Sequence, residues 1–162
     1  MMDERKSDGK EQAPATAGLR LLAFDSEDIE VISANLQDAI VRISDMAWLQ
    51  QEKRFALVCQ RFDWVAAEEG RIERCQTGLH FDGVRKVALQ GFDQTRKSRV
   101  LNLLSITFEP GEAPGGVILL TFSAGGAVRV EVDYIEAQMN DLDLRWKARK
   151  RPGHVLDDDD SG

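Results

Sequence analysis

The sequence contains few of the residues from which metal centres and nucleophilic active sites are usually built. Among its 162 residues are two cysteines and two histidines. Cys75 and His80 are the nearest pair of potential metal ligands, but a spacing of five along a strand places two side chains on opposite faces. His80 and His154 have no Gly-x-Ser-x-Gly or phosphate-loop motif beside them. We therefore expect no metal, no cofactor and no enzymatic activity, and we expect reduced cysteines with Cys59 in the core.

Long apolar segments are also missing. No uncharged apolar run approaches the roughly 20 residues that a membrane-spanning helix needs. The chain opens with Met-Met-Asp-Glu-Arg-Lys-Ser-Asp, which lacks the apolar core of a secretory signal. These absences predict a cytoplasmic protein that does not enter a membrane.

The net charge of −7 is unevenly distributed. The run Asp157–Asp160 near the C-terminus supplies four of the negative charges, and residues 1–17 are polar without any apolar periodicity. Segments of this composition bury too little apolar surface to fold. We expect a disordered tail over residues 1–17, a single domain over residues 18–152 and a disordered acidic tail over residues 153–162.

Most of the remaining sequence has the period of a β-sheet. Residues 128–134 alternate apolar and polar side chains, which is typical of an antiparallel strand with one buried face. Similar patterns predict strands at residues 19–24, 40–43, 46–50, 55–64, 71–81, 84–89, 100–108, 117–122 and 127–137. Residues 51–53 and the pair Asp82-Gly83 are expected to close hairpins, since Asp-Gly tolerates the positive φ of a type I′ turn.

One helix is predicted near the N-terminus, over residues 26–37. Asp25 can cap it, and Ile29, Ile32 and Leu36 form an apolar stripe. The fold class is therefore α+β: a predominantly antiparallel sheet or partly open barrel of seven to eight strands with this helix. Residues 135–146 fit both a continuing strand and a short C-terminal helix.

One segment carries a pattern suited to an anionic partner. Residues 145–151 contain five basic residues and a tryptophan, and such a combination can contact phosphates while the indole stacks on a base. The alternative is that the tryptophan anchors the last element on the core and the charges remain solvated. The candidate contact residues are Arg145, Trp146, Lys147, Arg149, Lys150 and Arg151. By contrast, Glu131 and Asp133 are interpreted as the solvated side of a strand, because no apolar surroundings raise their pKa values.

Several segments carry a family resemblance. They are the stretch from Leu21 to Ala39 with Asp25, Glu27-Asp-Ile and Leu36-Gln-Asp-Ala39, then Glu52-Lys-Arg-Phe-Ala-Leu-Val58, Arg61-Phe-Asp-Trp64, Arg129-Val-Glu-Val-Asp-Tyr-Ile-Glu-Ala137 and Asp141-Leu142. In these residues the chain resembles the uncharacterised alphaproteobacterial domain-of-unknown-function family 2948. The resemblance implies a bacterial cytosolic origin and supplies no catalytic residue.

Three functions remain open from the sequence. The first is a non-catalytic protein- or peptide-binding domain in the bacterial cytosol, which would use exposed sheet edges and aromatic residues such as Trp48, Phe62 and Trp64. The second is a nucleic-acid or ribosome-associated factor acting through residues 145–151. The third is a small-ligand binder or enzyme with its site in a barrel mouth. An unknown protein is the expected partner, and the sequence leaves the oligomeric state undetermined.

Overall fold

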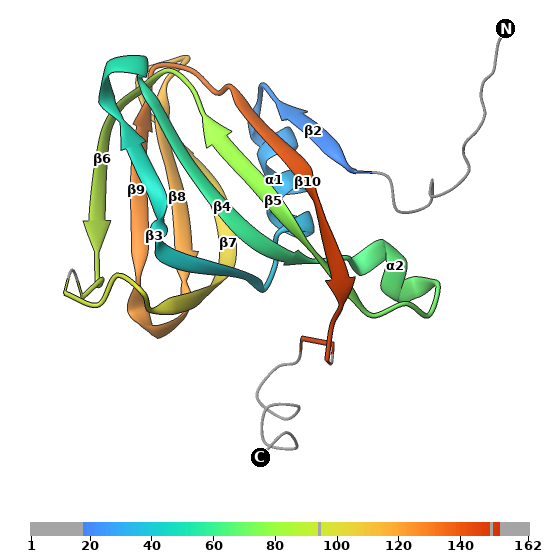
Figure 1. The fold of residues 1–162 in the computed structure, drawn as a ribbon. Coiled ribbons are helices and arrows are strands. Elements are labelled where there is room, and N and C mark those ends of the chain that lie inside the picture. The colour runs from blue at the N-terminus through green and yellow to red at the C-terminus, as the bar shows by residue number, and fades with distance from the viewer. Residues whose placement is uncertain (1–17, 94, 150, 153–162) are drawn as a thin grey trace, which may run out of the picture.

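The structure is a computed structural model that describes residues 18–93, 95–149 and 151–152. Its main element is a nine-stranded sheet in which every pair of neighbours is antiparallel (Figure 1). The strands are β2 (Arg20–Ala23), β3 (Ala39–Leu49), β4 (Arg54–Phe62), β5 (Glu73–Phe81), β6 (Val84–Gln90), β7 (Val100–Pro110), β8 (Gly116–Phe122), β9 (Ala127–Val132) and β10 (Ala137–Lys147). Their order is β2-β10-β5-β4-β3-β7-β8-β9-β6. The α+β class with a dominant antiparallel sheet is confirmed, but nine strands replace the seven to eight predicted.

Two α-helices accompany the sheet within the described residues. Helix α1 (Ser26–Asn35) follows Asp25, whose carboxylate accepts a hydrogen bond from the Asp28 N–H. Its apolar stripe lies in the same core as the inward side chains of the strands, as predicted. Helix α2 (Trp64–Glu68) was not predicted. It begins directly after β4, where the Asp63 carboxylate accepts a hydrogen bond from the Ala66 N–H. No described helix is long and apolar enough to cross a membrane.

The ambiguous C-terminal region is a strand, so the short C-terminal helix expected as an alternative is wrong for the described residues. Strand β10 pairs with β2 on one side and β5 on the other. Its register shifts between Asp141 and Arg145, where extra residues bulge outward and leave Leu142 and Leu144 exposed.

The two predicted hairpins have different outcomes. Residues 51–53 do join paired strands, β3 and β4, with Lys53 at a φ of 53°. The Asp82-Gly83 hairpin is wrong, because β5 and β6 are not neighbours in the sheet. Gly83 has a φ of 68° but Asp82 lacks the positive φ that a type I′ turn requires. Instead the Gly83 carbonyl accepts a bond from the Asp133 N–H, which directs β6 toward β9.

A bend in β3 gives the sheet its curvature. The first half of β3 pairs with both β4 and β7, whereas residues 46–49 pair with β4 alone. Between the halves the register shifts at residues 42–45, so that Val41 and Met46 both face inward although they are an odd number of positions apart. The curled sheet brings β6, the last strand in the order, back beside β3 and β4 (Figure 1).

Candidate functional site

An apolar groove lies where the curled sheet fails to close, between β3 and β6. Its volume is about 370 Å³. We call it the β3–β6 groove and define it by its lining residues: Ile43, Ser44, Met46, Trp48, Phe55, Val87, Leu89 and Lys97. Phe55 is buried at its base, and Leu89 is 44% exposed at its rim. The groove therefore combines a core-like floor with walls that solvent reaches.

Strand alternation explains why the lining is apolar. Because residues 42–45 shift the register, Met46 and Trp48 point to the same side as Leu57 and Phe55 of β4. On the opposite wall, Val87 and Leu89 are two positions apart on β6 and share one face. Each wall thus contributes alternate side chains of one strand. This spacing matches that of the side chains on one face of an extended peptide.

Backbone hydrogen bonds hold the two ends of the groove. At one end the Val84 N–H donates to the Lys53 carbonyl at 2.9 Å, and at the other the Ser44 N–H donates to the Lys97 carbonyl at 2.9 Å. Between these points β6 pairs only with β9, and residues 46–49 pair only with β4, among the strands the structure describes. Two strand edges consequently carry backbone donors and acceptors toward the groove without a ladder partner.

One end of the groove is basic. Lys97 lines it directly, and Arg99 is held beside it because its carbonyl accepts a bond from the Ile43 N–H at 3.1 Å. The Arg42 guanidinium donates to the Ser98 carbonyl at 2.9 Å. A ligand in the groove would therefore meet the Lys97 ammonium at the end where β3 bends, whereas Arg42 lines a separate hollow together with Asp45.

The structure separates the three aromatic residues that the sequence analysis grouped. Trp48 lies in the β3–β6 groove opposite Phe55, near the start of β4. Phe62 and Trp64 lie at the other end of β4, where their ring centroids are 4.6 Å apart. Trp48 therefore lies apart from Phe62 and Trp64, which are at the opposite end of β4.

The basic segment 145–151 lies away from the groove. Arg145 points inward and donates to Asp63 at 2.8 Å and Glu73 at 2.9 Å, so it joins β10 to β5 and α2. Trp146 is half-buried, Lys147 and Arg149 are exposed, and Lys150 lies outside the described residues. The Arg151 guanidinium lies 5.9 Å from the centroid of the Trp64 ring. The tails 1–17 and 153–162 also lie outside the described residues.

A buried ionic network was missed by the sequence analysis. Arg61 donates to both carboxylate oxygens of Asp141, at 2.7 and 2.6 Å, and both side chains are almost fully buried. Thr77 and the Leu19 N–H also donate to Asp141, at 2.8 and 2.9 Å. The alternation of Phe55, Leu57 and Cys59 could have placed Arg61 on the inward face, but it gives no partner for the guanidinium. This network joins β4, β5, β10 and the residues before β2.

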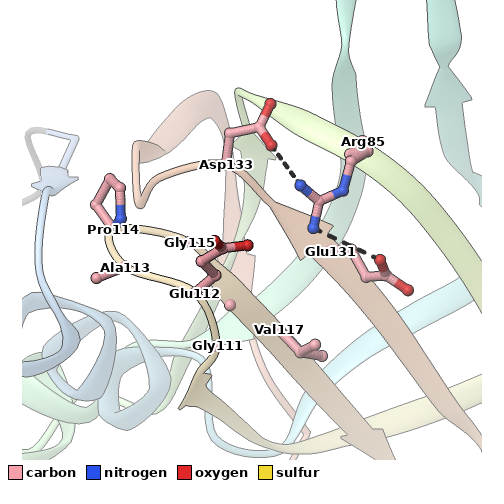
Figure 2. A pocket seen from close by; sticks show the side chains of 10 residues that line it. Arg85, Gly111, Glu112, Ala113, Pro114, Gly115, Val117, Glu131 and Asp133 are labelled. Atoms are coloured by element: carbon pink, nitrogen blue, oxygen red, sulfur yellow. Dashed lines mark hydrogen bonds and ion pairs between the residues drawn. The ribbon is translucent and has the colours of Figure 1, made fainter.

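A second, polar hollow lies beside the β7–β8 loop (Figure 2). Arg85 donates to Asp133 at 2.7 Å and lies 3.8 Å from Glu131, as the dashed lines in Figure 2 show. The Arg85 side chain is mostly exposed, and the side chains of Glu131 and Asp133 are partly exposed. The two carboxylates therefore face the same arginine, Arg85.

The cysteines are both free thiols in the core. Burial raises the pKa of the Cys59 thiol to about 12, so it remains protonated near neutral pH. Cys75 faces inward near Thr77, whereas His80 lies on the other face beside Asp82, as strand parity predicted. In the described part of the chain no group of three potential ligands could hold a metal ion.

Comparison with known proteins identifies a family but no characterised relative. Searches of curated proteins and of solved structures found no match. The model of a family described as proteins of unknown function, DUF2948, matches residues 19–154. That match spans nearly all of the folded chain, and the protein therefore belongs to the DUF2948 family.

Proposed function

We propose that the protein is a non-catalytic binding domain of the bacterial cytosol that takes an extended peptide segment of a partner protein into the β3–β6 groove. The observation that carries this proposal is the pairing of an apolar groove with two unpaired strand edges along its walls. A peptide entering there could continue the ladder of β6 or of β3 through its backbone. Affinity in this mode comes from main-chain hydrogen bonds, and specificity comes from pockets for alternate side chains.

The lining defines the chemistry of the peptide. Met46, Trp48, Val87 and Leu89 favour apolar side chains at alternate positions of an extended segment. Lys97 at the end near the bend favours a carboxylate, from an aspartate, a glutamate or the C-terminus of the peptide. The proposed partner segment is therefore a short strand, apolar on one face and acidic at one end.

Selection from a display library of random linear peptides tests the proposal. The full-length protein should enrich sequences with alternating apolar residues and an acidic end. Leu89→Arg should abolish their binding, because the substitution places a charge at the groove rim. Leu144→Arg is the matched control, since Leu144 is also exposed but lies in the β10 bulge. Binding that survives Leu89→Arg would place the peptide elsewhere and contradict the proposal.

A second experiment asks whether the peptide binds as a strand. Two methylated forms of an enriched peptide are made, one with methyl groups on the odd backbone nitrogens and one with them on the even nitrogens. Each form keeps the side chains but loses alternate backbone donors, so one of the two forms should fail to bind. Full binding by both methylated forms would refute strand addition. Dodecanoate provides the test for a small apolar ligand instead. If it binds in a manner sensitive to Leu89→Arg and no peptide is enriched, the groove serves a small molecule and the proposal is wrong.

A further inference from the structure

The outward ladder positions of β4, β5 and β10 carry no carboxylate, although the chain as a whole is acidic and the exposed bulge of β10 contains Asp143. In Figure 1 these strands lie in front of α1, whose apolar residues share the core with their inward side chains. Alternation and register assign the outward positions. They are Arg54, Ala56, Val58, Gln60, Phe62, Arg74, Gln76, Gly78, His80, Gln138, Asn140 and Trp146. None is a carboxylate, whereas two are arginines and four are amides, and Arg54 is paired with Asp82.

Aromatic and cationic side chains gather at one end of this face. Phe62 of β4 is opposite Arg74 of β5, which is in turn opposite Trp146 of β10, so the three form a row across the strands. The Arg74 guanidinium lies 5.8 Å from the centroid of the Phe62 ring and donates to the Gln60 carbonyl at 2.9 Å. Trp64 packs edge-on against Phe62. The strands therefore hold Arg74 and Trp146 side by side on a rigid support.

The chain after β10 adds cations to the same end. The Arg151 guanidinium lies over the Trp64 ring, which places this cation beside α2. Arg149 is exposed. Arg145, in contrast, is turned inward and already bonded to two carboxylates. Strand parity thus separates Arg145, which is structural, from Trp146, which is in the row with Arg74, and the exposed Arg149 and Arg151 follow the end of β10.

From this juxtaposition we infer that the end of the outer face formed by Trp64, Arg74, Trp146, Arg149 and Arg151 binds single-stranded nucleic acid. An indole beside arginines on an open sheet offers a stacking surface for a base and contacts for the adjacent phosphates. The neighbouring amides Gln60 and Gln76 can donate to and accept from base edges. A phosphorylated peptide would use the arginines but would leave the indole and the amides without a role.

The inference does not rest on the proposed peptide function, because the two surfaces share no residue. The acidic net charge does not oppose it either. Of the seven net negative charges, four come from Asp157–Asp160, which begin six positions after Arg151 in the sequence. Those carboxylates are near enough along the chain to compete with phosphates for Arg149 and Arg151. Replacing Asp157–Asp160 by asparagine should therefore tighten binding.

Fluorescence anisotropy with a labelled oligouridylate tests the inference on the full-length protein. Binding should weaken between about 50 and 200 mM salt, with a slope of roughly −0.7 for each phosphate contact. The double variant Arg149→Ala with Arg151→Ala should flatten the slope by up to about 1.4. Trp146→Ala should reduce affinity about tenfold and leave the slope unchanged. Arg85→Ala removes an exposed arginine elsewhere and should change neither quantity.

Three results would overturn the inference. The first is an absence of binding at the lowest salt. The second is equal affinity for the oligouridylate and for a duplex of the same length, since a duplex cannot stack its bases on Trp146. The third is binding that Trp146→Ala and the double arginine variant leave intact while both retain the wild-type circular dichroism spectrum. If Trp146→Ala does not fold, Trp146→Gln and the arginine variant decide the question. Leu89→Arg should leave the anisotropy unchanged, which separates this site from the groove.

Discussion

Replacing Asp141 by asparagine should lower the free energy of unfolding by about 3–5 kcal/mol, the cost of removing one partner from a buried ion pair. Asp141 accepts two bonds from Arg61, one from Thr77 and one from the Leu19 N–H. An asparagine oxygen can still accept from some of these donors, but it carries no charge to balance the Arg61 guanidinium. The nearest other carboxylate, that of Asp63, lies 3.9 Å from Arg61. The loss of stability therefore comes mainly from the buried Arg61 guanidinium, whose remaining counter-charge is Asp63, which also pairs with Arg145.

Urea denaturation followed by circular dichroism measures this loss. The double variant Arg61→Met with Asp141→Asn removes the stranded cation as well, and it should recover at least about 1 kcal/mol relative to Asp141→Asn alone. If Asp141→Asn costs less than about 1 kcal/mol, or if the double variant is less stable than the single one, the network does not stabilise the fold in the way argued here.

The same pair predicts a dependence on pH. Burial by itself raises the pKa of Asp141, but the hydrogen bonds from Arg61 and the Leu19 N–H outweigh it and hold the pKa below its usual value. A carboxyl with a lowered folded-state pKa adds stability above its unfolded pKa of about 3.9, and this is lost as the pH falls through the folded value. The stability difference between wild type and Asp141→Asn should therefore shrink below about pH 4. A constant difference in that range would contradict the assignment.

Three further predictions concern other parts of the fold. Cys59 should resist iodoacetamide at pH 8 in the native protein and react in urea, because burial raises the pKa of its thiol; mass spectrometry would detect native labelling, which would contradict its burial. Gly83→Ala should lower stability by about 1–3 kcal/mol in calorimetry, since the residue has a φ of 68° and its Cβ would lie 2.6 Å from the Tyr134 ring; an unchanged melting temperature would show that the turn relaxes. Arg145→Met should cost about 1.5–3 kcal/mol in urea denaturation, whereas Arg149→Ala should stay within about 0.5 kcal/mol, and equal effects would refute the different roles given to them.

Features encoded by neighbouring residues could be predicted from the sequence. The cap at Asp25 and the stripe of Ile29, Ile32 and Leu36 lie within a few turns of one another, and both appear in α1. Alternation along β4 and β9 likewise assigned inward and outward faces. The sequence did not predict which distant strands pair with one another. Asp82-Gly83 has the composition of a hairpin turn, but Gly83 bonds to Asp133 and β6 joins β9 instead.

The β3–β6 groove could not be predicted for the same reason. It exists because the last strand in the sheet order returns beside the bend of β3, and neither position follows from local composition. The register shift at residues 42–45 also decides that Met46 and Trp48 face the groove. The candidate anionic contact was proposed from composition alone. The structure adds Arg74 beside Trp146 and places Arg145 in partly buried ion pairs with Asp63 and Glu73, two consequences of strand parity.

The pairing of β2 with β10 has a consequence for the order in which the protein is assembled. Leu19 bonds to a residue 122 positions later in the chain, and α1 packs against β7. During synthesis the N-terminal segment therefore emerges long before the strands with which it pairs. Its apolar residues stay unburied until most of the chain has been made. Until β10 is made, β2 has no partner, whereas β3, β4 and β5 can already pair with one another. Among the described strands, the first to leave the ribosome is thus among the last to enter the sheet.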